Sequence, residues 1–154
     1  MSSESIPEYK IILASNSSIR KKILEGSGIS FEVVPSEVEE EELKQSLSSN
    51  NFREYCLALA KAKALDVSNK KKNAYVIGSD QICSYGEEIF SKPLTKENCF
   101  KTLSKLSGNT HYQNCGISIC KNGKEIWSHY AQAALTMKSL SDTEIRDYID
   151  KDEP

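Results

Sequence analysis

Short apolar runs alternate with stretches of helical periodicity along the chain. The runs Ile11–Ala14, Phe31–Val34 and Tyr75–Cys83 are rich in β-branched and other apolar residues, which predicts three buried strands. Apolar residues at helical spacing predict a helix from Asn51 to Val67. Because strands that alternate with helices are typical of α/β proteins, we expect a central sheet with helices packed on it.

Turn signals divide the second half of the chain. Tyr85–Glu88 predicts one hairpin turn. Asn122-Gly123 predicts a type I′ turn in a second hairpin, between strands at Tyr112–Cys120 and Glu125–Lys138. Together with the strand–helix–strand order of the first half, these hairpins predict a mixed sheet.

Capping signals predict three further helices. Ser17 caps a helix that Gly26 ends, Thr95 caps a second that Gly108 ends, and Ser141–Glu144 has the capping-box pattern of a last one. The residues expected to face the core are Ile19, Ile23 and Leu24, then Phe100, Leu103 and Leu106, then Ile145, Tyr148 and Ile149, with Leu94 and Cys99 spaced as a hydrophobic staple.

Composition limits the class of protein. With 154 residues, 38% hydrophobic and 27% charged, we expect one globular domain over residues 10–154 behind a polar leader, residues 1–9. A formal net charge of −2 argues against a nucleic-acid partner. Five cysteines without CxxC spacing indicate neither a disulfide framework nor a zinc site. Because neither a signal peptide nor a membrane-length apolar run is present, we expect no membrane association and a cytoplasmic location.

The third apolar run carries the first candidate for chemistry, Asp80. A carboxylate among apolar residues is costly to bury unless a cation, a hydrogen bond or a substrate proton compensates it. Two interpretations stay open at this point: a strand-end aspartate held by backbone amides, or a reactive carboxylate.

The turn after the first strand is a candidate anion site. Ser15–Ser18 leads into a helix N-terminus, where free N–H groups and the helix dipole favour an anion, and Arg20 in the first turn is suited to a phosphate. The alternative is that these serines only cap the helix.

Two lysines stand out, and the first is a candidate ligand of the same anion. Lys63 falls within about 60° of Cys56 on the apolar face of its helix, whereas Lys61 points to water. Lys63 is therefore either a snorkelling lysine or a phosphate ligand. Lys92 precedes Pro93, which keeps it extended and presents its side chain from a rigid position.

The run Glu37–Glu42 is the candidate source of a metal ligand. Such a run is normally the solvated start of a helix, which the helix dipole favours. Its alternative role is to supply a carboxylate to Mg²⁺, which prefers hard oxygen ligands.

Taken together, these segments resemble the Maf family of nucleoside triphosphate pyrophosphatases. The resemblance covers nearly the whole chain from Lys10 onward, with the motifs in the family's order and spacing. It is carried by LASNSSIR at 13–20, SEVEE at 36–40, LAKAKA at 59–64, IGSDQ at 77–81, KP at 92–93, LSG at 106–108 and the stretch 140–154. It implies an elongated mixed sheet flanked by helices, with a nucleotide-binding cleft of the kind found in ITPase-like folds.

The resemblance also implies an activity and the residues that carry it. The expected reaction is hydrolysis of a nucleoside triphosphate to the monophosphate and pyrophosphate with a divalent metal, Mg²⁺ or Mn²⁺, in a homodimer. By position, Asp80 would be the general base and, with Glu40, a metal ligand. The groups implied to hold the triphosphate are Ser15, Arg20, Lys63 and Lys92.

Two positions imply which nucleotide is bound. One branch of the family acts on dTTP and UTP and typically has arginine where Ile19 stands and threonine where Gln81 follows the aspartate. The residues here look like the other branch, which acts on 7-methyl-GTP. A methylated guanine carries positive charge, so an apolar residue in place of an arginine is physically reasonable. The dTTP/UTP activity is the alternative.

The end of the chain departs from the family pattern. The family continues after the position of Pro154 with a glycine-rich segment that contacts substrate, and we expect this chain to lack it. A nucleotide-binding module without turnover is therefore a second hypothesis. Composition alone also permits a structural or adaptor protein.

Overall fold

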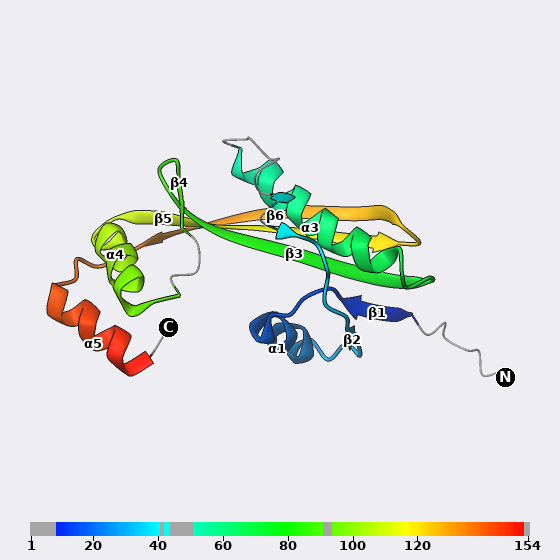
Figure 1. Cartoon of the computed structure of the whole chain (residues 1–154), viewed down its shortest axis with the longest axis horizontal. Coiled ribbons are helices and arrows are strands. Elements are labelled where there is room, and N and C mark those ends of the chain that lie inside the picture. The colour runs from blue at the N-terminus through cyan, green and yellow to red at the C-terminus, as the bar shows by residue number, and fades with distance from the viewer. Residues whose placement is uncertain (1–8, 41, 44–50, 91–93, 153–154) are drawn as a thin grey trace. The chain divides into compact units, whose positions relative to one another are not determined.

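A computed structural model describes residues 9–40, 42–43, 51–90 and 94–152. The described strands form a six-stranded sheet in the order β2-β1-β3-β5-β6, with β4 paired to β3. β1 is parallel to β2 and to β3, whereas β3 and β4 are antiparallel. The predicted α/β class with a mixed sheet is therefore confirmed (Figure 1).

The chain divides into two compact units. Unit 1 is Met1–Asp80 with Cys115–Tyr130, and unit 2 is Gln81–Asn114 with Ala131–Pro154. The long strands β3 (Ala74–Tyr85), β5 (Thr110–Lys121) and β6 (Lys124–Thr136) contribute residues to both units.

Unit 1 is built around β1 (Lys10–Leu13), which lies between β2 (Glu32–Val33) and the first half of β3. Its helices are α1 (Ser18–Gly26) and α3 (Phe52–Ser68), and the cap residues Ser17 and Asn51 accept hydrogen bonds from the first turns as expected of caps. The buried core of this unit consists of Ile12, Ala14, Ala64, Val67, Ala74, Val76 and Cys120.

Two glycines let α3 lie unusually close to the sheet. A Cβ at Gly78 would come within 2.3 Å of the carbonyl oxygen of Ala60, and one at Gly116 within 2.6 Å of the backbone of Cys56. Real Cβ atoms do not approach backbone that closely, so any larger residue at either position must push the helix away. Glycine at these two positions therefore sets the distance between α3 and the strands.

The β5–β6 turn confirms the predicted hairpin. Asn122 has φ 52° and Gly123 has φ 77°, the two positive values that a type I′ turn requires. The turn is tied to neighbouring elements of unit 1, because the N–H of Gly123 donates to Ser68 Oγ and the N–H of Asn73 donates to Asn122 Oδ1.

Unit 2 pairs α4 (Lys96–Leu106) with α5 (Asp142–Asp152), which lie side by side in Figure 1. The predicted capping box is confirmed, since Ser141 and Glu144 exchange hydrogen bonds between side chain and backbone. The strand β4 (Glu88–Phe90) returns along β3 through the predicted turn. The core of this unit is Cys99, Ile145 and Ile149, with Phe100, Leu103 and Leu140 packed against it.

Three predictions about apolar residues were wrong. Leu94 is 90% exposed and has a positive φ of 60°, so it forms no staple with Cys99. The expected core face of α1 is not buried, since Ile19 and Ile23 are 69% and 70% exposed. Tyr148 is also exposed, although its neighbours on the same face of α5 are buried. Helical spacing shows which residues share a face, but not whether another element covers that face.

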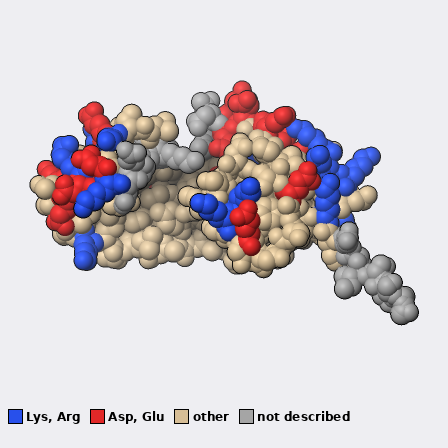
Figure 2. Space-filling view, turned by 90° about the horizontal axis from the view of Figure 1, so that it is seen from below, with Lys and Arg blue, Asp and Glu red and all other residues tan. Residues whose placement is uncertain are grey.

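Within the described residues, no helix combines the length and the apolar character that crossing a bilayer requires. On the face drawn in Figure 2, Lys and Arg side chains of the described residues lie beside Asp and Glu side chains, as the small net charge leads one to expect.

Candidate active site

One buried lysine joins two carboxylates inside unit 1. Lys63 Nζ lies 2.7 Å from Glu40 Oε1 and 3.2 Å from Asp80 Oδ1. It also donates to the backbone oxygen of Ser79 at 3.4 Å. The side chains of Lys63 and Asp80 are each only 9% exposed, whereas that of Glu40 is 43% exposed. A cation thus sits between a buried and a half-exposed acid.

Local structure explains how these groups meet. Every second residue of β3 from Ala74 onward is buried, so Asp80 shares the covered face of the strand with Gly78. On α3, Lys63 is buried and Lys61 is exposed, which confirms the predicted faces of the helix. Because Gly78 brings the helix backbone close, the Lys63 side chain reaches Asp80 directly instead of snorkelling to solvent.

Asp80 is electrostatically strained. Burial raises the pKa of its carboxyl above the ordinary value, while Lys63 and, more weakly, Arg20 lower that pKa and Glu40 raises it. Its Oδ2 atom is buried and has no hydrogen-bond partner among the described residues. A buried polar atom without a partner is costly, and the interpretation of a strand-end aspartate held by backbone amides leaves this atom unexplained.

Ser15 and Arg20 approach the same region from the β1–α1 turn. Ser15 is buried and accepts a hydrogen bond from the N–H of Ser17, whose own Oγ accepts from the N–H of Arg20. Ser17 therefore caps α1, as the more conservative interpretation predicted, and Ser15 stabilises the turn before it. Arg20 is close enough for its charge to act on Asp80, which brings it together with Lys63 around that carboxylate.

Three predicted site residues remain: Ile19, Gln81 and Lys92. Ile19 is exposed on α1 of unit 1. Gln81 belongs to unit 2, where its Nε2 donates to Gln113 Oε1 at 2.9 Å. The strand alternation puts its side chain on the opposite face of β3 from Asp80. Lys92 lies outside the described residues.

The acidic groups offer oxygen ligands of the kind that a hard divalent cation takes. Glu40 and Asp80 both contact Lys63 Nζ, and Asp80 Oδ2 has no hydrogen-bond partner within the part of the chain that the structure describes. Among the described residues, no group of three or more His, Cys, Asp or Glu forms a complete cage. That pattern fits Mg²⁺ or Mn²⁺, which commonly bind through one or two carboxylates and complete their shell with water and substrate phosphates.

A family model described as "Maf: Maf-like protein" matches residues 10–154, almost all of the chain. The chain belongs to the Maf family. Its curated Maf relatives include a "Nucleoside triphosphate pyrophosphatase" of Legionella pneumophila (strain Corby), 38% identical over 99% of this chain and 76% of the relative. They also include a "7-methyl-GTP pyrophosphatase" of Mesorhizobium japonicum, 40% identical over 85% of this chain and 67% of the relative.

A solved structure, "Structure of a HAM1 protein from Coxiella burnetii", is a weaker match. It is 14% identical, covers 82% of this chain and 71% of its own, and has a TM-score of 0.47.

One feature of this Maf-family site was not predicted. Asp66, in the last turn of α3, and Lys70, just after the end of that helix, bind the segment that carries Glu40. Asp66 Oδ2 accepts a hydrogen bond from the N–H of Glu37, and Lys70 Nζ lies 2.9 Å from Glu37 Oε2. In the sequence, Asp66 and Lys70 are visible only as an ordinary pair of opposite charges four residues apart, on either side of the predicted helix end at Val67.

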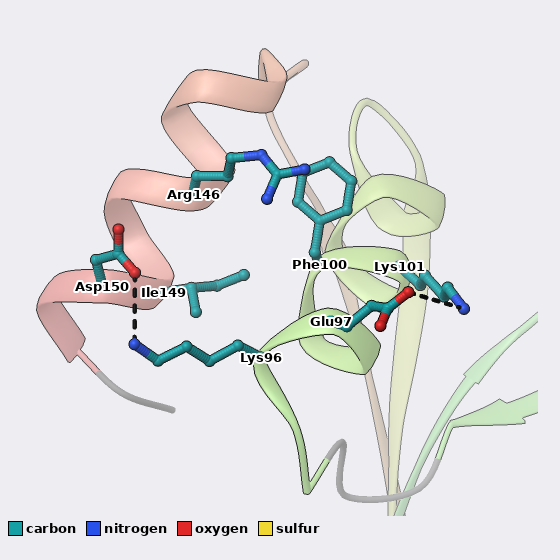
Figure 3. A pocket seen from close by; sticks show the side chains of 7 residues that line it. All are labelled: Lys96, Glu97, Phe100, Lys101, Arg146, Ile149 and Asp150. Atoms are coloured by element: carbon teal, nitrogen blue, oxygen red, sulfur yellow. Dashed lines mark ion pairs between the residues drawn. The ribbon is translucent and has the colours of Figure 1, made fainter.

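A separate pocket of about 570 Å³ opens between α4 and α5 of unit 2 (Figure 3). Arg146 lies over the ring of Phe100, and Lys96 and Lys101 form ion pairs with Asp150 and Glu97. Among the residues that the structure describes, no predicted site residue lines this pocket, and its charged groups already have partners, so we do not take it as the candidate active site.

Proposed function

We propose that this Maf-family protein is a metal-dependent pyrophosphatase that hydrolyses a nucleoside triphosphate to the monophosphate and pyrophosphate. The curated relatives are named as pyrophosphatases of nucleoside triphosphates, and such enzymes are hydrolases. The observation that carries the proposal is the buried Asp80 carboxylate, which binds Lys63 through Oδ1 and whose Oδ2 has no partner among the described residues.

The reaction needs neutralisation of phosphate charge and activation of one water molecule. Asp80 is the general base: its raised pKa makes it a better proton acceptor than an ordinary aspartate, and Oδ2 takes the proton of the attacking water. Lys63 holds Asp80 in place and offers its charge to the phosphate oxygens, together with Arg20 and Lys92. Ser15 shapes the turn that carries Arg20.

Glu40 and Asp80 are the residues that would hold the metal. When bound, Mg²⁺ or Mn²⁺ supplies positive charge to the phosphate oxygens. Of these two residues, Glu40 is half-exposed and Asp80 is buried.

We propose 7-methyl-GTP as the substrate. A relative at 40% identity carries that name. By the family resemblance, Ile19 and Gln81 are the residues expected to distinguish the two branches. UTP and dTTP are the alternative. A cytoplasmic location and a homodimer stay predictions.

The direct test is a nucleotide panel. Purified protein is incubated with Mg²⁺ or Mn²⁺ and with 7-methyl-GTP, UTP, dTTP or GTP while pyrophosphate release is followed. We expect release with 7-methyl-GTP above all. If nucleotides raise the melting temperature but no pyrophosphate appears, the protein is a binding module; if they do neither, the enzyme proposal is wrong.

A further inference from the structure

The segment that carries Glu40 is attached to α3 at two points. The first is the ion pair of Glu40 Oε1 with Lys63 Nζ, at 2.7 Å. The second is the hydrogen bond from the N–H of Glu37 to Asp66 Oδ2, at 2.9 Å. Lys70 Nζ reinforces the second point, since it lies 2.9 Å from Glu37 Oε2 and 3.6 Å from Asp66 Oδ2.

The two attachments lie near each other on both elements. Asp66 follows Lys63 by three residues on α3, close to one helical turn, and Glu37 precedes Glu40 by three residues in the attached segment. Glu37 meets Asp66 and Glu40 meets Lys63, so the segment runs in the direction opposite to that of the helix.

The contact made by Asp66 acts on the course of the backbone. Asp66 Oδ2 accepts a hydrogen bond from the main-chain N–H of Glu37, so this contact fixes the position of the backbone at Glu37. An ion pair between two side chains would fix only their rotamers. The Asp66 side chain is 24% exposed and that of Glu37 is 81% exposed. The anchoring group is thus the more buried and better held partner.

We propose that Asp66 is a positioning residue for Glu40: by binding the N–H of Glu37 it holds the 37–40 segment on α3, so that the Glu40 carboxylate meets Lys63 beside Asp80. Asp66 touches no reacting group and acts only through Glu40. The attachment of the 37–40 segment to α3 needs no nucleotide or metal. Its consequence for metal binding rests on the proposed function.

The first measurement is amide hydrogen exchange of the metal-free full chain. The informative amides are those of Glu37 and of Leu43, which donates to Glu39 in the helical turn after the attachment. We expect Asp66→Ala to speed exchange at both by about fivefold, the effect of losing one hydrogen bond. Asp66→Asn should stay within about twofold of the unmodified chain, because its amide oxygen still accepts the bond.

The second measurement is the dissociation constant of Mn²⁺ alone, by calorimetry. We expect Asp66→Ala to weaken binding by about fivefold and Asp66→Asn by less than about twofold. In a Glu40→Gln background, Asp66→Ala should cause no further loss, because a residue that acts only through Glu40 has nothing left to position. The matched control is Lys10→Ala, which removes an exposed ion pair with Glu32 in the same unit and should change neither measurement.

The outcomes separate this proposal from the proposed function. Unchanged exchange in Asp66→Ala overturns the positioning role, as does a loss of Mn²⁺ affinity that persists in full in the Glu40→Gln background. If the unmodified chain binds no Mn²⁺, the proposed metal site fails. The positioning role is then tested by hydrogen exchange alone. Faster exchange in Asp66→Ala but not in Asp66→Asn supports it, and unchanged exchange in Asp66→Ala overturns it.

Discussion

At the scale of single residues, Asp80 is subject to opposing influences. Burial favours its neutral form, while Lys63 and Arg20 favour the carboxylate. A general base benefits from this balance, because it must be ionised before the reaction and yet hold a proton during it. Its unpartnered Oδ2 is the atom at which the proton would arrive.

Replacing Asp80, the proposed general base, tests its role in proton transfer directly. We expect Asp80→Asn to lower kcat by at least about 10²-fold, because an amide cannot accept the proton. The melting temperature and the stabilisation by nucleotide should change little, since Asn keeps the shape of the side chain. Loss of folding together with binding would instead assign Asp80 a structural role.

The pH dependence of the activity follows from the direction in which the pKa of Asp80 is shifted. Because the pKa of folded Asp80 is raised, activity should fall as pH decreases through that raised value. Because the pKa of Asp80 is higher in the folded protein than in the unfolded chain, Asp80 contributes most to stability at pH values below the ordinary aspartate pKa. This contribution is lost as pH rises through the pKa of Asp80 in the folded protein.

Arg20 offers a test of the same electrostatics. Its charge lowers the Asp80 pKa, so Arg20→Gln should move the acidic limb of kcat/KM to higher pH, whatever it does to the maximum rate. A limb that stays in place would mean that another group titrates there.

At the scale of elements, α3 organises the site. It carries Lys63 and Asp66, and it lies close to the sheet because Gly78 and Gly116 have no side chains. The two glycines differ in what they face: Gly78 meets Ala60 and Ala64, next to Lys63, whereas Gly116 meets Cys56 and Leu57, two turns earlier.

This difference supplies a matched pair of variants. We expect Gly78→Ala and Gly116→Ala each to lower the free energy of unfolding by about 1–3 kcal/mol, as overpacking does, in urea titrations. Only Gly78→Ala should also lower kcat, because it moves Lys63 away from Asp80. Equal loss of kcat in both variants, measured at a temperature where both are folded, would show that the helix responds as a rigid whole.

At the scale of the whole molecule, membership of the Maf family indicates nucleoside triphosphate pyrophosphatase activity but not which nucleobase the protein recognises. Relatives of similar identity carry the general name and the 7-methyl-GTP name. The two residues that the family resemblance links to the nucleobase are Ile19, which belongs to unit 1, and Gln81, which belongs to unit 2.

Replacing Ile19 and Gln81 together tests whether these residues select the nucleobase. We expect the variant Ile19→Arg with Gln81→Thr to shift the ratio of kcat/KM from 7-methyl-GTP toward UTP and dTTP by about tenfold or more. An unchanged profile in the nucleotide panel would show that base selection lies elsewhere in the chain.

Local patterns in the sequence predicted most of the elements. The caps Ser17 and Thr95, the capping box at Ser141 and the turn at Asn122-Gly123 all form as expected, because each depends on neighbours within a few residues. The buried face of α3 was also predictable, since helical spacing fixes which side Lys63 occupies. The exposed Leu94 and Ile19 show the limit of such patterns.

The sequence by itself determined the strand and helix types, the face on which Lys63 lies and the family to which the chain belongs, since these depend on spacing along the chain. Only the tertiary structure decided that Lys63 meets Asp80 and Glu40 together, and that Asp66 holds the segment on which Glu40 lies. Those contacts join residues 17 to 29 positions apart, and they depend on how closely α3 packs on the sheet. Packing distance is a property of assembled elements, which no periodicity records.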